Sequence, residues 1–547
     1  MTRFLMLFVG LLMLFAAEAK AAGTADVSLA MAPDGVRATY VLDRAVSRFD
    51  FAKADVVRSA HFELRTPGLR LEGDAIVSSK PFRRFDLLVR PMTEERDAKY
   101  PAHFRIGSGG VVFAPALVGN LDAWLTRLSL RLSPGEIRLP ASGDVARGFV
   151  FIGPAALRDQ SGGVDLVADP ATPRWLIDRS RSALSAGLAT FTRALGAPLP
   201  RKPLLIVRHQ GSERNFRIGD VTQGFVTALR FHGAAWERPD ELAGKAIQSF
   251  LLHEAFHFWN GGLAQPAEGT ATWLHEGAAD YAALLGGLEN GVLAEADVRR
   301  SLGDSLQRCR QAVQLAGDKP LAEMGFLTNQ VRYPCGTLLQ WAADMHVRRA
   351  SGGKRTILDV WGGVIRSAAA RPEKSYSLEN FYAAAGLGNG SAFAPARLLV
   401  HTGGPQRWTA LTDALEALGA DIHPVPSQTS RRFALAFHLL RQSCRSLDAS
   451  EGFGFWTETS TVRLQSPKGC GNLAGDPRLR SIEGGDPFEM SEETYAAVQR
   501  RCARGEAVSI LTDEGRTLAA PCAAPLPDAP NDYRVDRRLP VPRGAAP

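Results

Sequence analysis

Short apolar runs separated by turn residues occupy the first part of the chain. Typical runs are Arg37–Leu42, Phe85–Arg90 and Gly110–Phe113. Runs of this length, bounded by Gly, Pro, Asp and Ser, are typical of antiparallel strands. The pattern therefore predicts a β-rich N-terminal domain over residues 24–169.

The apolar period changes after the segment 169–173, which contains two prolines. Residues 175–195 have helical spacing that stops at Gly196. Beyond this helix we expect strands at 203–208 and 224–231, and helices at 241–260 and 272–285. The stretch up to about 382 is predicted to be mostly helical. Residues 170–395 thus form an expected domain in which a mixed sheet is followed by a helical subdomain.

From about residue 396 the pattern indicates short strands, glycine turns and four of the six cysteines. Arg478–Ala519 is predicted to form a strand, a helix at 491–503 and a second strand. We expect a small α+β domain at 396–522, followed by a poorly ordered tail rich in Pro and Ala at 523–547. The whole chain is therefore predicted to be a multidomain α+β protein.

The N-terminal segment has the features of a signal peptide. Arg3 precedes an apolar run at Phe4–Phe15, and small residues follow at 17–21. The run is shorter than the roughly 20 residues that span a bilayer, although an uncleaved anchor is the alternative. We expect residues 1–21 to be removed and the protein to be exported, either to a periplasm or to the outside. No other segment is apolar enough to span a membrane.

Composition narrows the possible classes of protein. The chain has 547 residues, of which 45% are hydrophobic and 22% are charged, as in globular proteins. The net charge is +7, but the arginines are scattered along the chain rather than grouped, so no nucleic-acid partner is expected. The oligomeric state is not predicted.

Six cysteines in an exported chain indicate disulfides. Fifteen complete pairings are possible, and sequential pairing is the simplest. It would join Cys309 to Cys335, Cys444 to Cys470 and Cys502 to Cys522. Zinc-type C-x-x-C spacing is absent, so a metal site made of cysteines is not expected.

The predicted helix at 241–260 contains His253, Glu254 and His257 in an H-E-x-x-H motif. Two histidines four residues apart project from one face of a helix, where both can bind one metal ion. The glutamate between them can reach a metal-bound water. A core helix with two histidines on one face is the alternative. Glu276, with 18 residues between it and His257, supplies the third ligand that a catalytic zinc needs.

These residues resemble a known family. H-E-x-x-H followed after 18 residues by Glu is the gluzincin pattern of thermolysin-like peptidases, and the segments at 253–260, 276–281 and 333–339 are similar to the glycyl aminopeptidase family. The resemblance covers about residues 240–365. It implies a thermolysin-like zinc peptidase domain that acts on peptides or proteins. In this family a PDZ module often follows the catalytic domain, and the strand, helix and strand after residue 478 are loosely similar to half of one.

The resemblance also implies a role for each site residue. His253, His257 and Glu276 would hold one Zn²⁺, and Glu254 would be the general base toward the attacking water. Tyr333 would donate a hydrogen bond to the developing oxyanion. Asp280 would either accept a hydrogen bond from a ligand histidine or be an ordinary residue on the helix surface. His275 is expected to be structural or to line the pocket.

One motif of the related aminopeptidases is missing. They carry a Gly-x-Met-Glu-Asn-like segment whose acid binds the amino group of the substrate, but the matching window Gly224–Ala228 has no acid and places Thr227 there. Strict aminopeptidase action is therefore not predicted, and Glu268 is the alternative amine anchor. Two functions remain: a zinc-dependent peptidase, and a non-catalytic relative that binds peptides and keeps zinc for structure.

Overall fold

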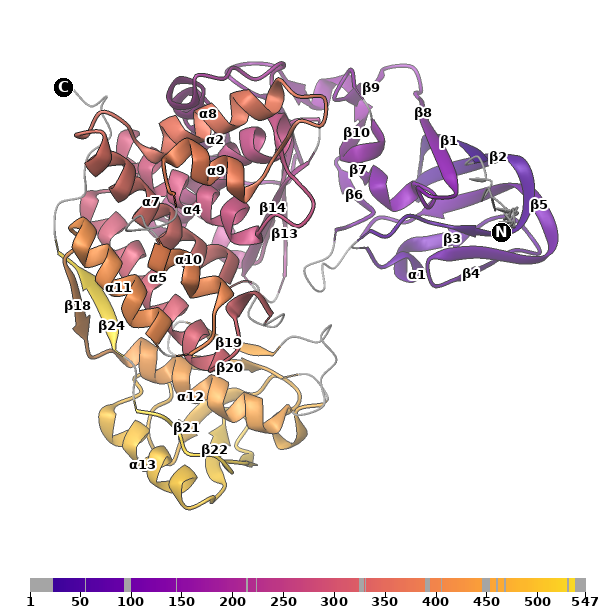
Figure 1. Cartoon of the computed structure of the whole chain (residues 1–547). Helices are drawn as coiled ribbons and strands as arrows, with labels where there is room; N and C mark the ends of the chain where they lie inside the picture. Colours follow the sequence, from indigo (N-terminus) through magenta and orange to yellow (C-terminus); the bar gives the residue numbers. More distant parts are fainter. Residues whose placement is uncertain are drawn as a thin grey trace, which may run out of the picture.

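The computed structural model describes residues 23–536, with gaps at 55, 93–99, 144, 213–214, 223, 324–328, 330, 389–393, 405, 445–452, 459–460, 467–468 and 529–530. Three parts lie side by side: an N-terminal β part, a large helical part with its own sheet, and a small C-terminal part (Figure 1). This arrangement agrees with the predicted multidomain α+β class. The expected signal peptide and residues 537–547 lie outside the described residues.

Two sheets build the N-terminal part. The first has the order β3-β5-β2-β1-β8, with β4 paired to β5, and the second has the order β6-β7-β10-β9. Along β1, Ala25, Val27 and Leu29 are buried while the residues between them are more exposed, which is the period of two of a strand with one face in a core. The bounds are β1 Gly23–Ala32, β2 Gly35–Asp50, α1 Arg58–His61, β3 Phe62–Leu64, β4 Arg70–Glu72, β5 Ala75–Val89, β6 His103–Ile106, β7 Gly109–Phe113, β8 Trp124–Arg131, β9 Glu136–Leu139 and β10 Phe149–Pro154.

A five-stranded sheet joins the N-terminal part to the helices. Its order is β11-β12-β13-β15-β14, and only the outer strands are antiparallel to their neighbours. Along β13, Leu205 and Val207 pack into the helical core, whereas Leu204 and Ile206 pack into the core of the N-terminal part. Strands covered on both faces are apolar throughout. The bounds are β11 Arg158–Asp159, β12 Asp165–Ala168, β13 Leu204–Gln210, β14 Phe216–Thr222 and β15 Val226–His232.

Several helices pack on one another beside this sheet. They are α2 Arg174–Leu195, α3 Glu241–His257, α4 Thr272–Glu289, α5 Glu295–Ala316, α7 Gly336–Ala350, α8 Ile357–Ala369, α9 Leu378–Ala385, α10 Ala394–His401 and α11 Gln406–Leu418. The short strand β16 Gln265–Pro266 pairs with β17 Ser375–Tyr376. Two π-helical turns, η5 Phe258–Leu263 and η8 Val331–Cys335, continue α3 and precede α7.

The central part extends beyond both expected boundaries. β11 and β12 precede residue 170 but belong to its sheet. At the other end, Leu399, Leu411 and Leu415 are buried in the same core as the zinc-motif helix, although short strands were expected there. The region after 396 therefore begins with two helices of the central part. The sequence pattern missed this because a short amphipathic helix and a buried strand look alike locally.

The predicted poorly ordered tail contains a strand. β24, Asp532–Val535, pairs antiparallel with β18, Ile422–Val425, at the edge of the helical part (Figure 1). Val535 is 4% exposed, so this end of the chain is part of the core. The expectation of disorder is wrong for these four residues, because their pairing partner is more than 100 residues away and leaves no local signal.

The C-terminal part combines two helices with an antiparallel sheet of order β19-β20-β21-β22-β23. The predicted helix after Ser491 is present, and the side chain of Ser491 accepts a hydrogen bond from the backbone N–H of Thr494 as its cap. The similarity to a PDZ module stays a prediction. The bounds are α12 Gln428–Ser443, β19 Gly454–Glu458, β20 Thr461–Gln465, β21 Arg478–Ile482, α13 Glu492–Ala503, β22 Val508–Thr512 and β23 Thr517–Ala520.

Three disulfides close local loops. They join Cys309 to Cys335, Cys444 to Cys470 and Cys502 to Cys522, which confirms the sequential pairing. Disulfides persist in oxidising compartments, so they agree with an exported protein. Within the described part of the chain, no helix has the length and apolar character needed to cross a membrane.

Candidate active site

Helix α3 carries both histidines of the H-E-x-x-H motif. Its first turn is capped by Asp240, whose side chain accepts a hydrogen bond from the N–H of Ala243 at 2.7 Å. His253 and His257 follow each other by one turn and are each 8% exposed. Their Nε2 atoms lie 3.0 Å apart. Helix geometry alone brings these two atoms together, as the sequence motif predicts.

Helix α4 brings Glu276 to the same point. Its Oε2 atom lies 3.4 Å from Nε2 of His253 and 3.3 Å from Nε2 of His257. Burial opposes ionisation of Glu276, but its contacts with the two histidines hold its pKa well below the ordinary value. Two imidazole nitrogens and a carboxylate oxygen, all within 4.8 Å of one another, match the donor set of a catalytic zinc site with an open fourth position.

A glycine contact sets the distance between α4 and the segment that carries Tyr333. A Cβ atom on Gly277 would lie only 2.3 Å from the backbone of Gly336, so the two helices meet backbone to backbone. Gly277 follows Glu276 directly, and Gly336 comes three residues after Tyr333. This close approach lets Tyr333 lie beside the histidines, with its ring centroid 5.9 Å from that of His253.

The second ring nitrogen of each histidine is held by a side-chain oxygen. Nδ1 of His253 lies 2.7 Å from Oδ1 of Asp280, and Nδ1 of His257 lies 2.8 Å from Oδ1 of Asn260. A proton on Nδ1 leaves Nε2 free to bind a metal. The sequence had suggested Asp280, but it gave no indication of Asn260, which lies in the π-helical turn η5 after the motif.

Asn260 is itself held by a chain of hydrogen bonds. Its Nδ2 donates to the backbone oxygen of His275 at 2.9 Å, and the hydroxyl of Tyr376 donates to the backbone oxygen of Asn260 at 2.9 Å. That hydroxyl also lies 2.9 Å from Nδ1 of His275. The ring of His275 stacks on that of His257, and burial lowers its pKa to about 3. His275 is thus a neutral supporting residue.

An open cleft of about 530 Å³ leads to this group. Its walls come from β14, α3, α4, α5 and η8, and they include His253, Glu254, Asp280 and Tyr333. Glu254 is 5% exposed, and burial raises its pKa to about 7. A carboxyl group in such a state exchanges a proton readily near neutral pH.

The segment that matches the amine-binding motif of related aminopeptidases lies one strand away from the cleft. Gly224–Ala228 forms the turn into β15 and its first residues, and Thr227 is fully buried. The edge strand β14, which the sequence analysis did not predict, lines the cleft instead. Its acid, Asp220, lies 3.2 Å from Arg230 on β15. Glu268, the alternative anchor, is exposed in a turn and is not among the residues that line the cleft.

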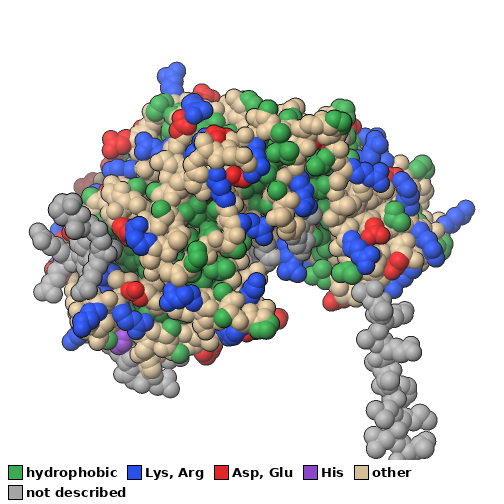
Figure 2. Space-filling model, turned by 90° about the horizontal axis from the view of Figure 1, so that it is seen from above, with side chains coloured by type: hydrophobic (Ala, Val, Ile, Leu, Met, Phe, Trp, Pro, Cys, Tyr) green, Lys and Arg blue, Asp and Glu red, His purple; other side chains and the backbone are tan. Residues whose placement is uncertain are grey.

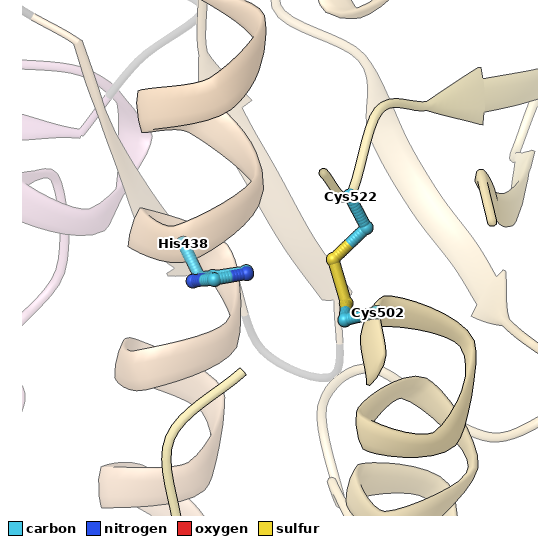
Figure 3. A group of neighbouring side chains, drawn as sticks. All are labelled: His438, Cys502 and Cys522. Carbon is cyan, nitrogen blue, oxygen red and sulfur yellow. A yellow bond between two sulfur atoms is a disulfide. The ribbon is translucent and has the colours of Figure 1, made fainter. Parts of the chain in front are cut away.

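A second group of possible metal ligands occurs in the C-terminal part. His438 on α12 faces Cys502 and Cys522, but the two sulfur atoms are bonded to each other (Figure 3). Cysteine binds metals as a thiolate, which a disulfide cannot provide. This group is therefore a disulfide with a neighbouring histidine.

Comparisons with known proteins agree with this architecture. No family model and no curated protein sequence matches the chain. Among solved structures, an aminopeptidase N family protein from Idiomarina loihiensis is similar with a TM-score of 0.59 and 14% identity, over 95% of this chain and 99% of that one. Two more distant matches are an M1 zinc metallopeptidase mutant from Deinococcus radiodurans and Legionella pneumophila aminopeptidase A in complex with aspartic acid. The first has a TM-score of 0.39 and 15% identity, over 70% of this chain and 94% of that one. The second has a TM-score of 0.41 and 11% identity, over 70% of this chain and 49% of that one. The chain therefore shares its fold, over nearly its whole length, with an aminopeptidase N family protein.

Proposed function

We propose that this protein is an exported zinc-dependent peptidase. The observation that carries the proposal is the convergence of His253, His257 and Glu276 at one point beside an open cleft, which is lined by His253, Glu254 and Tyr333. A helix that is merely part of the core would not place a histidine of the group and a buried acid on the wall of a cleft.

One zinc ion would be held by Nε2 of His253, Nε2 of His257 and a carboxylate oxygen of Glu276. When bound, zinc supplies a Lewis acid that polarises the scissile carbonyl and lowers the pKa of water. Asp280 and Asn260 orient the two imidazoles by accepting their Nδ1 protons. Together they keep both Nε2 atoms in the neutral, ligating form.

Glu254 acts as the general base. It lines the cleft one residue after His253, and its raised pKa places it near neutrality. It takes a proton from the attacking water and later delivers it to the leaving amine. General acid–base catalysis of this kind contributes on the order of 10² to 10⁴ in rate.

Tyr333 stabilises the negative charge that develops on the carbonyl oxygen. Tyr333 lines the same cleft, and burial together with the charge of Glu276 raises the pKa of its hydroxyl above the ordinary value. The hydroxyl therefore stays protonated and can donate a hydrogen bond. Loss of one such donor typically reduces kcat by about 10² to 10³.

The substrate is proposed to bind in extended form along β14. This strand is the last of its sheet, so its outer edge can pair with a peptide backbone. Tyr333 and Glu254 would then flank the scissile bond. Pairing through the backbone accepts many sequences, which suits a peptidase of broad specificity.

Metal analysis together with one substitution tests this function. We expect about one zinc per chain, lost in His257→Ala. Glu254→Gln should keep the zinc and lose hydrolysis of a mixed peptide library, because an amide cannot accept the proton of water. Zinc retained by the wild type together with no turnover would instead favour the non-catalytic binding protein. Turnover by metal-loaded Glu254→Gln would overturn the assigned base.

Acetylation of the substrate distinguishes an aminopeptidase from an enzyme of relaxed specificity. Asp220 is paired with Arg230, and Asp280 is bonded to His253, so neither is free for a substrate ammonium. We expect acetylated peptides to be cut at near-normal rates. An enzyme that buries the ammonium against an acid would lose about 30- to 5,000-fold in kcat/KM on acetylation. Such a loss would show that another acid binds the amine.

A further inference from the structure

The edge strand of the cleft presents a cation to the site. Arg217 on β14 lines the same cleft as His253, Glu254 and Tyr333. Its side chain is exposed to solvent, yet desolvation lowers its pKa, as expected of a cation inside a concave wall. Glu254, the proposed base, lines the same cleft, and its negative charge opposes this shift.

Packing against one aromatic ring holds Arg217 in this position. Its guanidinium carbon lies 4.9 Å from the centre of the Phe250 ring. A Cβ atom on Gly219, two residues along the same face of β14, would lie 2.6 Å from that ring, so the strand runs directly over it. Phe250 precedes His253 by three residues on α3. Phe250 thus lies about one helical turn from the first histidine, and Arg217 packs on this part of α3.

Arg217 has no acidic partner of its own within the described part of the chain. Its guanidinium contacts the Phe250 ring, and no carboxylate of the described residues lies within ion-pair distance. Asp220 is the nearest acid on the same strand. It is three residues away, so its side chain points to the opposite face of the sheet, and it pairs with Arg230. The other arginine of the cleft, Arg308 on α5, lies one turn from Asp304, so those two charges offset each other.

We propose that Arg217 binds a carboxylate of the substrate close to the scissile bond. A planar guanidinium binds a carboxylate through two parallel hydrogen bonds. This inference rests on the proposed peptidase function and adds its substrate class.

The carboxylate could come from the free C-terminus of a short peptide or from an acidic side chain. The chemistry is shared, and matched peptides separate the two sources. One arm compares acetylated tetrapeptides with a free C-terminus against the same peptides with a C-terminal amide. The other arm compares Glu with Gln at the positions that flank the bond cut by the wild type.

We expect the wild-type enzyme to cut carboxylate-bearing peptides with higher kcat/KM than their neutral counterparts. Arg217→Met should lower kcat/KM for the carboxylate-bearing peptides by about 10- to 100-fold and change it for the neutral peptides by less than about threefold. Arg217→Lys should recover part of the loss, and Arg308→Met should keep the preference. The comparison in which the carboxylate raises kcat/KM then identifies the source of the carboxylate.

A binding measurement separates this inference from the proposed function. A fluorescent acetylated tetrapeptide containing Glu, and its amidated Gln counterpart, are titrated into zinc-loaded Glu254→Gln protein, with and without Arg217→Met. Weaker binding of the acidic peptide alone supports the role of Arg217 even where turnover is absent. The inference is overturned if Arg217→Met weakens the binding of both peptides equally. It is also overturned if the Glu254→Gln protein that keeps Arg217 binds both peptides equally. Absence of turnover on every peptide, with selective binding intact, contradicts only the peptidase function.

Discussion

At the scale of single residues, the site depends on how each proposed ligand is oriented. Asp280 and Asn260 accept the Nδ1 protons of the two histidines, and the Tyr376 hydroxyl holds the backbone of Asn260. Without these partners each imidazole could rotate or carry its proton on the nitrogen that should bind the metal. We therefore expect these orienting residues to support binding of the proposed metal ion.

We expect Asp280→Ala to weaken zinc binding by about 10- to 100-fold, because His253 would lose the acceptor that fixes its tautomer. The measurement is competition with a chelator of known affinity. Glu289→Ala is the matched control, since Glu289 lies on the same helix but pairs with Arg193 away from the site. Equal zinc affinity in both variants would assign Asp280 to the helix surface.

His103 makes the N-terminal part sensitive to acid. Burial, followed by the charge of Arg105, lowers its pKa to about 3, while an unfolded chain binds the proton at about 6.5. Below pH 6.5 the unfolded state binds more protons at this site than the folded state. Lowering the pH therefore lowers the free energy of unfolding, by about 2 kcal/mol at pH 5. His103→Asn should flatten this dependence in urea unfolding at pH 7.5 and pH 5. A slope equal to that of the wild type would exclude His103 as its source.

At the scale of elements, the crossing of α4 and α7 at two glycines sets the position of Tyr333. Gly277→Ala should force the helices apart and lower stability by about 1–3 kcal/mol, since its Cβ would overlap the backbone of Gly336. Thermal unfolding and kcat are the measurements. Gly363→Ala on α8 is the control, because its Cβ would meet nothing within 4 Å and Ala is the better helix former. Similar unfolding temperatures for the two variants would contradict a tight crossing.

The Cys309–Cys335 disulfide ties α5 to the π-helical turn that carries Tyr333. It closes a loop of 26 residues, and removing such a constraint costs about 3 kcal/mol. We expect the double variant Cys309→Ala/Cys335→Ala to lose stability and kcat while it keeps its zinc, because Cys335 is two residues from Tyr333 but is not a ligand. Cys502→Ala/Cys522→Ala, in the C-terminal part, should lose stability with kcat unchanged. Unchanged kcat in both pairs would show that Tyr333 is held without the disulfide.

At the scale of the whole molecule, β24 near the end of the chain returns to α5, which forms part of the cleft wall. The hydroxyl of Tyr533 on β24 accepts hydrogen bonds from Arg310 on α5 at 2.9 Å and from Trp408 on α11 at 3.1 Å. A Cβ atom on Gly303 would lie 2.2 Å from the backbone oxygen of Tyr533, so β24 packs directly on α5. On the face seen in Figure 2, Lys and Arg are dispersed among the acids.

We expect a chain that ends at Asp528 to lose several degrees in unfolding temperature and to show faster amide exchange in α5. The buried Ile422 and Val535 would lose their contact, and burial of such side chains contributes about 1.5–3 kcal/mol each. A chain that ends at Asp536 is the control, because it keeps β24. Protection of α5 equal in both truncations would show that β24 is not required to hold the cleft wall.

The sequence by itself determined the features that depend on local spacing. Two histidines four residues apart share a helix face wherever the helix lies, so His253 and His257 could be paired in advance, and the helices that begin near 174, 241, 272 and 492 follow from apolar period and caps. Tertiary structure decided what depends on pairing between distant segments. The edge position of β14, the hydrogen bond of Asn260 to His257, the exposure of Arg217 in the cleft and the return of β24 to α5 all follow from topology. A strand takes its place in a sheet from contacts with partners far along the chain, and short segments carry no signal of those partners.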